Sequence, residues 1–378
     1  MNGWLYQILA AFLCSLGITS FLIPKILLIS FRKQLFDYAD ERKVHTGIVP
    51  RLGGVAFTPA VVISVALLVG VNAVVNELDF GRFLNGSSQL ALGLCALLLL
   101  YFEGVADDLI GVGYKAKFGF QFFCASLVVA SGIWLNDLYG LLGIYALPAW
   151  VGYPLSVVVI VFVLNAVNLI DGIDGLASGL SAIATFFFGC LFAYQGEWIY
   201  ATLAFTTLGT LLPFYYYNVF GRAQERRKIF MGDAGSQTIG LILGTLAIRL
   251  SQSDPTLLKS VPDPIVVAFS LLLVPVLDVL RVIIHRVRNG QNPFKPDMNH
   301  IHHKFLALGM SHHTTMCVIL AIAAFFALLN IGLLNVVNAN LILVIDVVLW
   351  TAMHIWLSQM IRRTKRLKQR LQEANQDA

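Results

Sequence analysis

Long apolar segments separated by short polar loops run through almost the whole chain. About 20 consecutive apolar residues form a helix long enough to cross the hydrocarbon core of a bilayer. At that length the pattern predicts eleven membrane-spanning helices, near residues 4–30, 53–75, 87–106, 118–135, 153–170, 176–195, 197–217, 235–252, 264–285, 314–336 and 340–360. The expected architecture is therefore an all-α, polytopic membrane protein. We expect one transmembrane domain over residues 1–360 and a basic tail over 361–378.

The composition excludes a soluble protein and a secreted one. Of the 378 residues, 58% are hydrophobic and only 12% are charged, whereas a soluble domain usually has about 25% charged residues. The first apolar segment has no small-residue cleavage pattern and is too long for a signal peptide, so we expect it to remain as the first span. The five cysteines lie inside apolar segments without CxxC spacing, which indicates packing rather than metal binding or redox chemistry.

Lysine and arginine residues are distributed unevenly between alternate loops. If the amino terminus is outside, most of the 26 Lys and Arg residues fall in the inner loops and the tail, and the outer loops hold only Arg82 and Lys259. Positive charge is enriched on the cytoplasmic side of membrane proteins. The distribution therefore predicts an outer amino terminus and a cytoplasmic carboxyl terminus. The tail is expected to be a solvated helix end, with contact to anionic lipid as the alternative.

The stretch NAVNLIDGIDGLASG (165–179) places polar side chains in the turn between the fifth and sixth expected helices. Asn165, Asn168 and Asp171 are three residues apart and share one helical stripe, and Asp174 follows. At the inner rim these acids avoid the roughly 2.5–3.5 kcal/mol that a charge costs at mid-bilayer. Helix capping is the alternative explanation. Because a cap needs only one such residue, we favour a ligand site.

Two further inner loops carry acids in a similar setting. Asp107 and Asp108 are adjacent in ADDLIG (106–111), and Asp233 lies between glycines in FMGDAGS (230–236). Adjacent carboxylates repel each other unless a cation or hydrogen-bond donors lie between them. Glycine-flanked backbone at a helix start can bind phosphate. The alternatives are a solvated pair of acids and an ordinary turn.

Histidines and arginines occupy the remaining inner loops. Five of the eight histidines lie between residues 300 and 313, including His300, His302 and His303 in HIHHK. A zinc site is one interpretation, but no cysteine accompanies these histidines, so we favour binding of an anionic diphosphate. The stretch KVHTGIVPRLGG (43–54) adds His45 and Arg51 at the start of the second expected span.

These loops together predict an enzyme at one membrane face. Carboxylates bind hard cations such as Mg²⁺, and cations neutralise phosphate groups. The apolar flanks of the same cleft could hold a lipid tail. The pattern thus indicates a membrane enzyme that handles a nucleotide-like diphosphate and a lipid phosphate. We expect no nucleic-acid partner. A lipid or sugar transporter would carry its acids nearer the membrane midplane, and a scaffold protein would not need converging acids and histidines.

The five stretches quoted above, in their order along the chain (43–54, 106–111, 165–179, 230–236 and 300–304), resemble the polyprenyl-phosphate N-acetylhexosamine-1-phosphate transferases. They look most like the bacterial branch that uses undecaprenyl phosphate. The resemblance implies an eleven-span fold in the bacterial inner membrane with a cytoplasmic active site. It also implies transfer of GlcNAc-1-phosphate from UDP-GlcNAc to undecaprenyl phosphate, with release of UMP, as the first step of O-antigen, common-antigen or teichoic-acid synthesis. Another UDP-amino sugar or a phospho-MurNAc-pentapeptide donor stays open, as does a homodimer.

The resemblance also implies residue roles. Asp107, Asp108, Asp171 and Asp174 match catalytic residues, and Asp233 with Asp171 matches the ligands of Mg²⁺, for which Mn²⁺ can substitute. Asn168, Asp174, Asn218, Phe230, His300, His302 and His303 match the nucleotide and sugar-diphosphate pocket, and Lys117, His45 and Arg51 match the lipid-phosphate site. Two departures stand out. Gly111 occupies the position where the family often has a third acid, and a loop of fifteen residues runs from Asn218, which matches the family's Asn after the seventh span, to Asp233.

Overall fold

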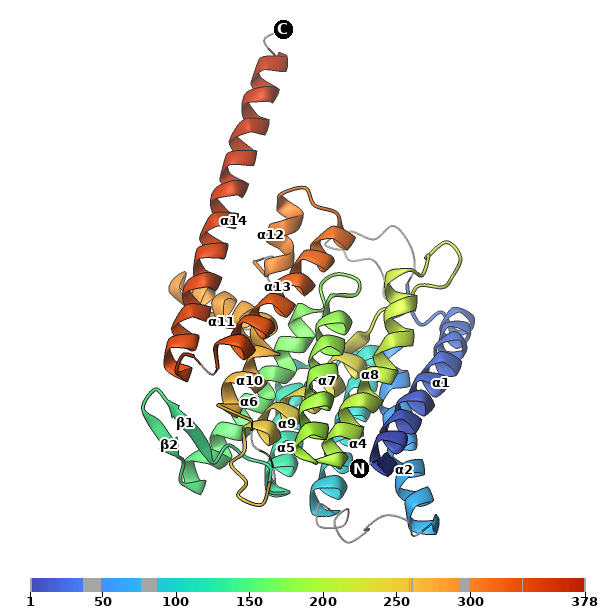
Figure 1. Ribbon diagram of the computed structural model, residues 1–378. Helices are drawn as coiled ribbons and strands as arrows, with labels where there is room; N and C mark the ends of the chain where they lie inside the picture. Colours follow the sequence, from blue (N-terminus) through green and yellow to red (C-terminus); the bar gives the residue numbers. More distant parts are fainter. Residues whose placement is uncertain are drawn as a thin grey trace.

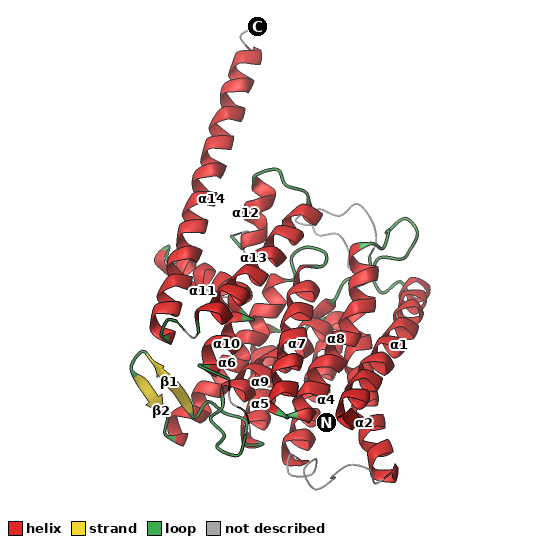
Figure 2. Ribbon diagram, in the orientation of Figure 1, coloured by secondary structure: helices red, strands yellow, loops and turns green. Residues whose placement is uncertain are grey.

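The chain is helical almost throughout. A computed structural model of the protein describes residues 2–36, 49–75, 87–257, 259, 261–292, 299–334 and 336–376. His45 lies outside these residues. Apart from loops and one short two-stranded hairpin, the described residues form helices (Figure 2), so the expected all-α class is confirmed.

Ten of the eleven expected segments each overlap one long helix, and the segment near 264–285 overlaps two (Figure 1). The elements are α1 (Asn2–Lys33), η1 (Gly53–Ala56), α2 (Phe57–Val75), α4 (Ser87–Ile110), α5 (Tyr114–Ala130), β1 (Asp137–Leu141), β2 (Ile144–Ala146), α6 (Ala149–Ile170), α7 (Leu176–Gln195), α8 (Trp198–Val219), α9 (Gly232–Ser251), α10 (Pro264–Ser270), α11 (Leu273–Arg288), α12 (Ile301–Ala307), α13 (His312–Leu333) and α14 (Ala339–Gln376). The hairpin, in which β1 pairs antiparallel with β2, and the short helix α12 were not expected.

Seven of the described helices are long and apolar enough to cross a membrane, and an eighth crossing is added if α10 and α11 form one bent span. The chain is therefore a multi-pass helical membrane protein. Helices α5, α8 and α9 do not meet the same condition, so the expected count of eleven crossings stays a prediction.

Helix α9 lies at the centre of the bundle. Every residue from Ala234 to Ser251 is buried, and the helix contacts α4, α6, α7, α8 and α10. Its small residues allow these neighbours to come close. A Cβ atom added to Gly240 would lie only 2.6 Å from the Cα of Leu164 in α6. Because protein surrounds α9, the helix can carry Gly, Ser, Thr and Gln instead of lipid-compatible side chains.

The expected single helix near 264–285 is two helices. Helices α10 and α11 meet at a bend of 77°. Pro275 lies in the first turn of α11 and has no N–H to donate to the carbonyl of residue 271. The bend turns α11 away from the direction of α10. By contrast, α14 continues without a break past residue 360, where the sequence placed the start of the tail, and its end projects from the bundle (Figure 1).

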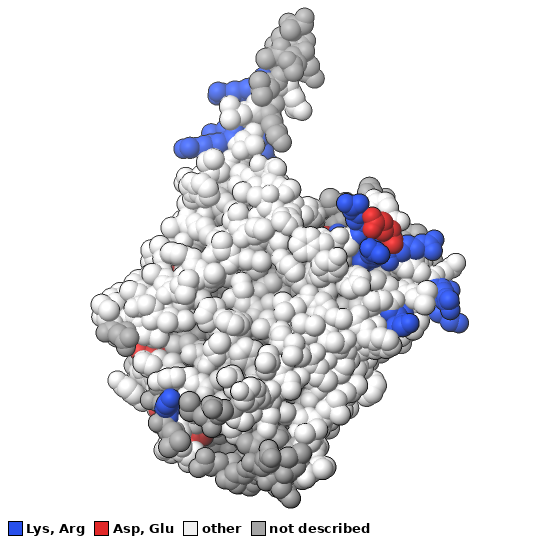
Figure 3. Space-filling view, turned by 45° about the vertical axis from the view of Figure 1, so that its right-hand side comes forward, with Lys and Arg blue, Asp and Glu red and all other residues white. Residues whose placement is uncertain are grey.

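Charged side chains gather at the extremities of the molecule. Figure 3 shows lysine and arginine on the projecting part of α14 and around one corner of the body; below them lies a broad, almost uncharged band, with a few charged side chains beyond it at the lower left. Many large apolar side chains are exposed on the surface, including Phe21, Leu67, Phe123 and Val348. Such a band is expected where helices face lipid tails instead of water.

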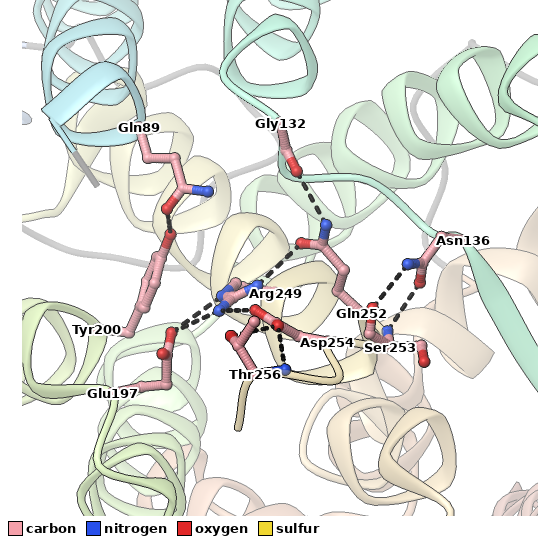
Figure 4. Close-up of polar contacts among 10 residues, drawn as sticks. All are labelled: Gln89, Gly132, Asn136, Glu197, Tyr200, Arg249, Gln252, Ser253, Asp254 and Thr256. Carbon is pink, nitrogen blue, oxygen red and sulfur yellow. Dashed lines mark hydrogen bonds and ion pairs between the residues drawn. The ribbon is translucent and has the colours of Figure 1, made fainter. Parts of the chain in front are cut away.

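The carboxyl-terminal end of α9 is anchored by a partly buried ion-pair network (Figure 4). The Arg249 guanidinium is 8% exposed and lies 2.7 Å from Glu197 Oε2 and 2.9 Å from Asp254 Oδ2. Glu197 directly precedes α8, and Asp254 lies in the loop after α9. The network therefore joins the start of α8 to the end of the central helix.

We expect Arg249→Met to lower the thermal unfolding temperature of the protein in detergent. The substitution leaves two carboxylates without their cation, and breaking a buried pair typically costs about 3–5 kcal/mol; partial exposure of both acids places the expected loss nearer 2 kcal/mol. Arg222→Met is the matched control, because its pair with Glu225 is exposed. Equal unfolding temperatures for the two variants would show that the network does not stabilise α9.

Candidate active site

The described part of the 43–54 stretch and the 230–236 stretch are joined through their backbones. Phe230 N donates to Pro50 O over 2.8 Å, Gly53 N to Phe230 O over 2.9 Å, and Gly54 N to Met231 O over 2.8 Å. A Cβ atom on Gly54 would lie 2.1 Å from the Cα of Gly235, so this contact requires glycine. Two loops that are far apart in the sequence thus meet at the start of α9.

Asp108 caps the amino terminus of α9. Its Oδ1 accepts a hydrogen bond from Asp233 N (2.7 Å), and its Oδ2 accepts one from Ala234 N (2.9 Å). The first N–H groups of a helix have no partner within the helix, and a carboxylate there is also favoured by the helix dipole. Gly104, one turn earlier in α4, permits this approach, since a Cβ there would lie 2.6 Å from the Cα of Ala234.

Asp107 and Asp233 share one lysine. Lys117 Nζ lies 2.9 Å from Asp107 Oδ2 and 3.0 Å from Asp233 Oδ1. Asn168 also donates a hydrogen bond to Asp233 Oδ1 and another to Ser236 Oγ, at 2.7 Å. Burial alone would lower the pKa of Lys117, but the two carboxylates outweigh it and raise the pKa. Burial and the neighbouring Asp107 raise the pKa of Asp233, and Lys117 opposes them.

The turn between α6 and α7 brings two more acids to the same place. Burial raises the pKa of Asp171 to about 7; the negative charges of Asp174 and Asp233 act in the same direction, and Arg51 opposes them. Asp171 is therefore within electrostatic reach of Asp233 and Arg51. Asp174 forms an ion pair with Lys228, with 2.5 Å between Oδ2 and Nζ. The expected convergence of these acids is observed.

Asn218 holds two of these loops together. Its Oδ1 accepts a hydrogen bond from Gly175 N (2.6 Å), and its Nδ2 donates to Ile229 O (2.8 Å). Its side chain is buried. Gly175 has a φ of 76°, a left-handed conformation that glycine adopts without strain. Both polar ends of the amide are engaged with backbone, which fits a loop-positioning role. Contact of Asn218 or Phe230 with a nucleotide stays a prediction.

The histidine motif is anchored by Asp278 of α11. His300 Nδ1 lies 2.8 Å from Asp278 Oδ2, and Ile301 N donates to Asp278 Oδ1 over 3.0 Å. Arg281 contacts the same Oδ1 at 3.0 Å. The fully buried carboxylate thus fixes the start of α12, the helix that carries His302.

His302 packs against the acid-bearing turn. It is 1% exposed, and among the described residues neither ring nitrogen has a hydrogen-bond partner. Burial, together with His303 and His300, lowers the pKa of His302 to about 3, so the ring is neutral. A Cβ atom on Gly172 would lie 2.2 Å from His302 Nε2. The described parts of all five stretches, and Lys117, therefore meet at one end of the bundle.

Sequence reasoning gave no role to three residues that organise the site: Lys228, Asp278, and Ser236 at the end of the FMGDAGS stretch. Asp278 had a readable signal, because an acid inside an expected membrane span is costly and usually functional. Lys228 and Ser236 had none, since their partners Asp174 and Asn168 lie more than 50 residues away in the sequence.

The donor set suits a hard cation. In the part of the chain that the structure describes, no group of three or more His, Cys, Asp or Glu side chains is arranged to hold a metal ion. Mg²⁺, however, usually binds proteins through one or two carboxylates and completes its shell with water and substrate phosphates. Asp107 and Asp233 both contact the ammonium group of Lys117, so the two carboxylates lie on either side of one positive charge.

Known proteins are similar in sequence to most of this chain. The family model described as glycosyl transferase family 4 matches residues 90–251. A "Probable undecaprenyl-phosphate N-acetylglucosaminyl 1-phosphate transferase" of Bacillus subtilis is 31% identical over 330 residues, which cover 85% of this chain and 84% of the relative. The chain belongs to glycosyl transferase family 4. As expected from its motifs, this membrane protein is a glycosyl-1-phosphate transferase.

Two other relatives of this family 4 transferase match a comparable length of the chain. The decaprenyl-phosphate N-acetylglucosaminephosphotransferase of Mycobacterium tuberculosis is 32% identical over 322 residues, covering 80% of this chain and 76% of the relative. The undecaprenyl-phosphate alpha-N-acetylglucosaminyl 1-phosphate transferase of Escherichia coli K12 is 28% identical over 302 residues, covering 79% of this chain and 76% of the relative.

We expect Gly172→Ala to reduce the turnover of this family 4 transferase about tenfold or more. The added methyl group would overlap His302, which is buried beside two other histidine rings and has little room to move; displacements of about 1 Å at a site can cost 10²-fold. Gly119→Ala is the control, because a Cβ there meets nothing within 4 Å. The unfolding temperatures of both variants are measured first, and turnover is compared only if they equal that of the wild type. Normal turnover of Gly172→Ala would place His302 outside the site.

Proposed function

We propose that this transferase moves N-acetylglucosamine 1-phosphate from UDP-GlcNAc to undecaprenyl phosphate and releases UMP. The observation that carries the proposal is the arrangement of Asp107, Lys117 and Asp233 at the ends of apolar helices. In the proposed orientation, carboxylates and a cation at the helix ends would meet both a membrane lipid and a water-soluble diphosphate. The names of the Bacillus and Escherichia relatives support the sugar and the lipid acceptor.

The proposed reaction is a direct phosphoryl transfer. A phosphate oxygen of the lipid forms a bond to the sugar-linked phosphorus, and the bond from that phosphorus to the bridging oxygen of UDP breaks. UMP leaves with the bridging oxygen and its electron pair. A phosphate monoester is already mostly ionised near neutral pH, since its second pKa is about 6. The enzyme therefore has little need of a strong base, and its main work is to position two anions.

The side chains divide this work. Asp108 holds the amino terminus of α9 and thereby fixes Asp233, and Asn168 orients the Asp233 carboxylate. Lys117 offsets the repulsion between Asp107 and Asp233 and supplies positive charge near the lipid phosphate. Precisely held charges of this kind are worth more in a site from which water is excluded.

We propose Asp233 and Asp171 as the residues that hold Mg²⁺. When bound, Mg²⁺ would neutralise phosphate oxygens of the nucleotide sugar. The histidine motif fits the donor side of the pocket, because neutral His302 lies beside the turn that carries Asp171 and Asp174.

We also infer an eleven-span arrangement in the bacterial inner membrane, with the amino terminus outside and the site in the cytoplasm. The positive-inside distribution of Lys and Arg supports this orientation. In Figure 1 the amino terminus lies at the end of the bundle opposite to α12 and the carboxyl terminus. Helix α9, although less apolar than the others, is surrounded by protein and can still cross.

The decisive assay uses the purified full-length chain with UDP-GlcNAc, MgCl₂ and a short polyprenyl phosphate. We expect UMP release that requires the lipid, stops when EDTA removes the divalent cation, and returns with Mg²⁺ or Mn²⁺. Release of UMP only from another UDP-amino sugar or from UDP-MurNAc-pentapeptide would change the donor and keep the reaction. No UMP from any of these donors would reject the proposed activity.

We expect Asp107→Asn and Asp108→Asn to separate two roles. Both should lower turnover about 100-fold, the usual cost of removing one electrostatic group from a reaction centre. Asp108→Asn should also lower the unfolding temperature, because its amide group would face a backbone N–H of α9 and leave a buried donor unsatisfied, at a cost of about 1–3 kcal/mol.

The matched control is Asp137→Asn in the distant hairpin strand β1, which should change neither property. If Asp107→Asn turns over at a near-normal rate, Asp107 does not act at the reacting centre. If Asp108→Asn is as stable as the wild type, the cap does not hold α9.

A further inference from the structure

A cavity that the acid cluster does not line lies between α11, α12 and α14. Its volume is about 740 Å³. Asp107, Lys117, Asp171 and Asp233 are not among the residues that line it. It is therefore a separate feature of the fold.

The lining changes from apolar to basic. Leu277 of α11 and Val347 of α14 belong to the apolar part, whereas Arg288, Lys304 and Arg362 belong to the basic part. Along α14 the apolar lining residues Val347 and Ile355 precede Arg362, whereas along α11 Arg281 lies among the apolar lining residues and Arg288 follows them. From Val347 to Arg362 the wall of α14 extends roughly 22 Å at 1.5 Å per residue. No acidic side chain of the described chain lines this cavity. Its chemistry matches a long amphiphile with an anionic headgroup.

Two buried polar side chains in the wall lack partners. His354 is 5% exposed, and neither of its ring nitrogens has a hydrogen-bond partner among the described residues; the same is true of the indole N–H of Trp350, which is 4% exposed. The two rings lie 4.7 Å apart. An unsatisfied buried donor or acceptor typically costs about 1–3 kcal/mol. A polar headgroup in the cavity would satisfy these atoms.

Lys304 supplies positive charge beside these groups, as does Arg281. Its Nζ donates to Ser358 Oγ over 3.0 Å, and no carboxylate in the described part of the chain pairs with it. Burial lowers the pKa of Lys304 to about 8, and the positive charge of Arg281 acts in the same direction. A nearby phosphate would relieve this crowding of cations.

We propose that this cavity binds one anionic membrane phospholipid. The headgroup phosphate contacts Lys304, Arg362 and His354, and an acyl chain lies against Leu277 and Val347. Because the acid cluster does not line the cavity, the occupant is retained and does not react. The binding is independent of the proposed transfer reaction, since it is measured without a sugar nucleotide.

The lipid site is also connected to the histidine motif through Arg281 and Asp278. Arg281 lines the cavity and contacts Asp278 Oδ1, while Asp278 Oδ2 holds His300. A bound phosphate near Arg281 would therefore act on the residue that anchors α12.

The experiment measures quenching of Trp350 fluorescence by brominated lipid. The full-length protein is placed in nanodiscs with increasing fractions of dibrominated phosphatidylglycerol or dibrominated phosphatidylcholine, and the signal of Trp350→Phe is subtracted. We expect half-maximal quenching at about tenfold less phosphatidylglycerol than phosphatidylcholine. Lys304→Gln and Arg362→Gln should each remove most of this preference.

Arg363→Gln is the matched control, since it removes the same charge from the neighbouring residue of α14 that does not line the cavity. It should leave the preference unchanged. Equal quenching by the two lipids, or an equal effect of Arg362→Gln and Arg363→Gln, would overturn the proposal. It would also be overturned if unlabelled polyprenyl phosphate displaced the brominated lipid at lower concentration than phosphatidylglycerol, because the cavity would then belong to the acceptor lipid.

Discussion

The contact between Asp108 and the start of α9 is the constraint on which the site depends. A central helix that is buried on every side cannot leave its first N–H groups to water, so a side chain from another helix must accept them. Asp108 does so with both oxygens. The same contact fixes α4 against α9 and leaves Asp107, the next residue, facing Asp233 across Lys117. The same contact thus caps α9 and brings the charged side chains together.

Charge balance explains why acids can collect here at all. Asp107 and Asp233 share Lys117, Asp174 pairs with Lys228, and Arg51 opposes the raised pKa of Asp171. Lys117 comes from the first turn of α5, whereas Lys228 and Arg51 come from two separate loops, so the opposite charges join parts of the chain that are far apart in the sequence. Two phosphate-bearing substrates would shift this balance towards negative charge. A divalent cation is the simplest addition that restores it.

The helices were predictable from the sequence because a bilayer imposes one length on every apolar segment. The bend after α10 was missed because Pro275 is tolerated in a first helical turn and gives no clear break in the pattern. Asp107, Asp171 and Asp233 were singled out as candidates because acids are conspicuous between apolar segments. Their partners were not, since hydrogen bonds such as that of Ala234 to Asp108 join residues 126 positions apart. Local periodicity carries no information about such pairs.

Helix α11 connects the two functional regions because it departs from the direction of α10. Asp278 is buried towards α12 and holds His300, whereas Arg281, one turn later, lines the lipid cavity and contacts the same carboxylate. A straight continuation of α10 would carry these residues along the bundle axis, away from the start of α12. The 77° bend instead lets one short helix hold the histidine motif and form the cavity wall. The break that the sequence pattern concealed is therefore what brings the histidine motif and the lipid cavity together.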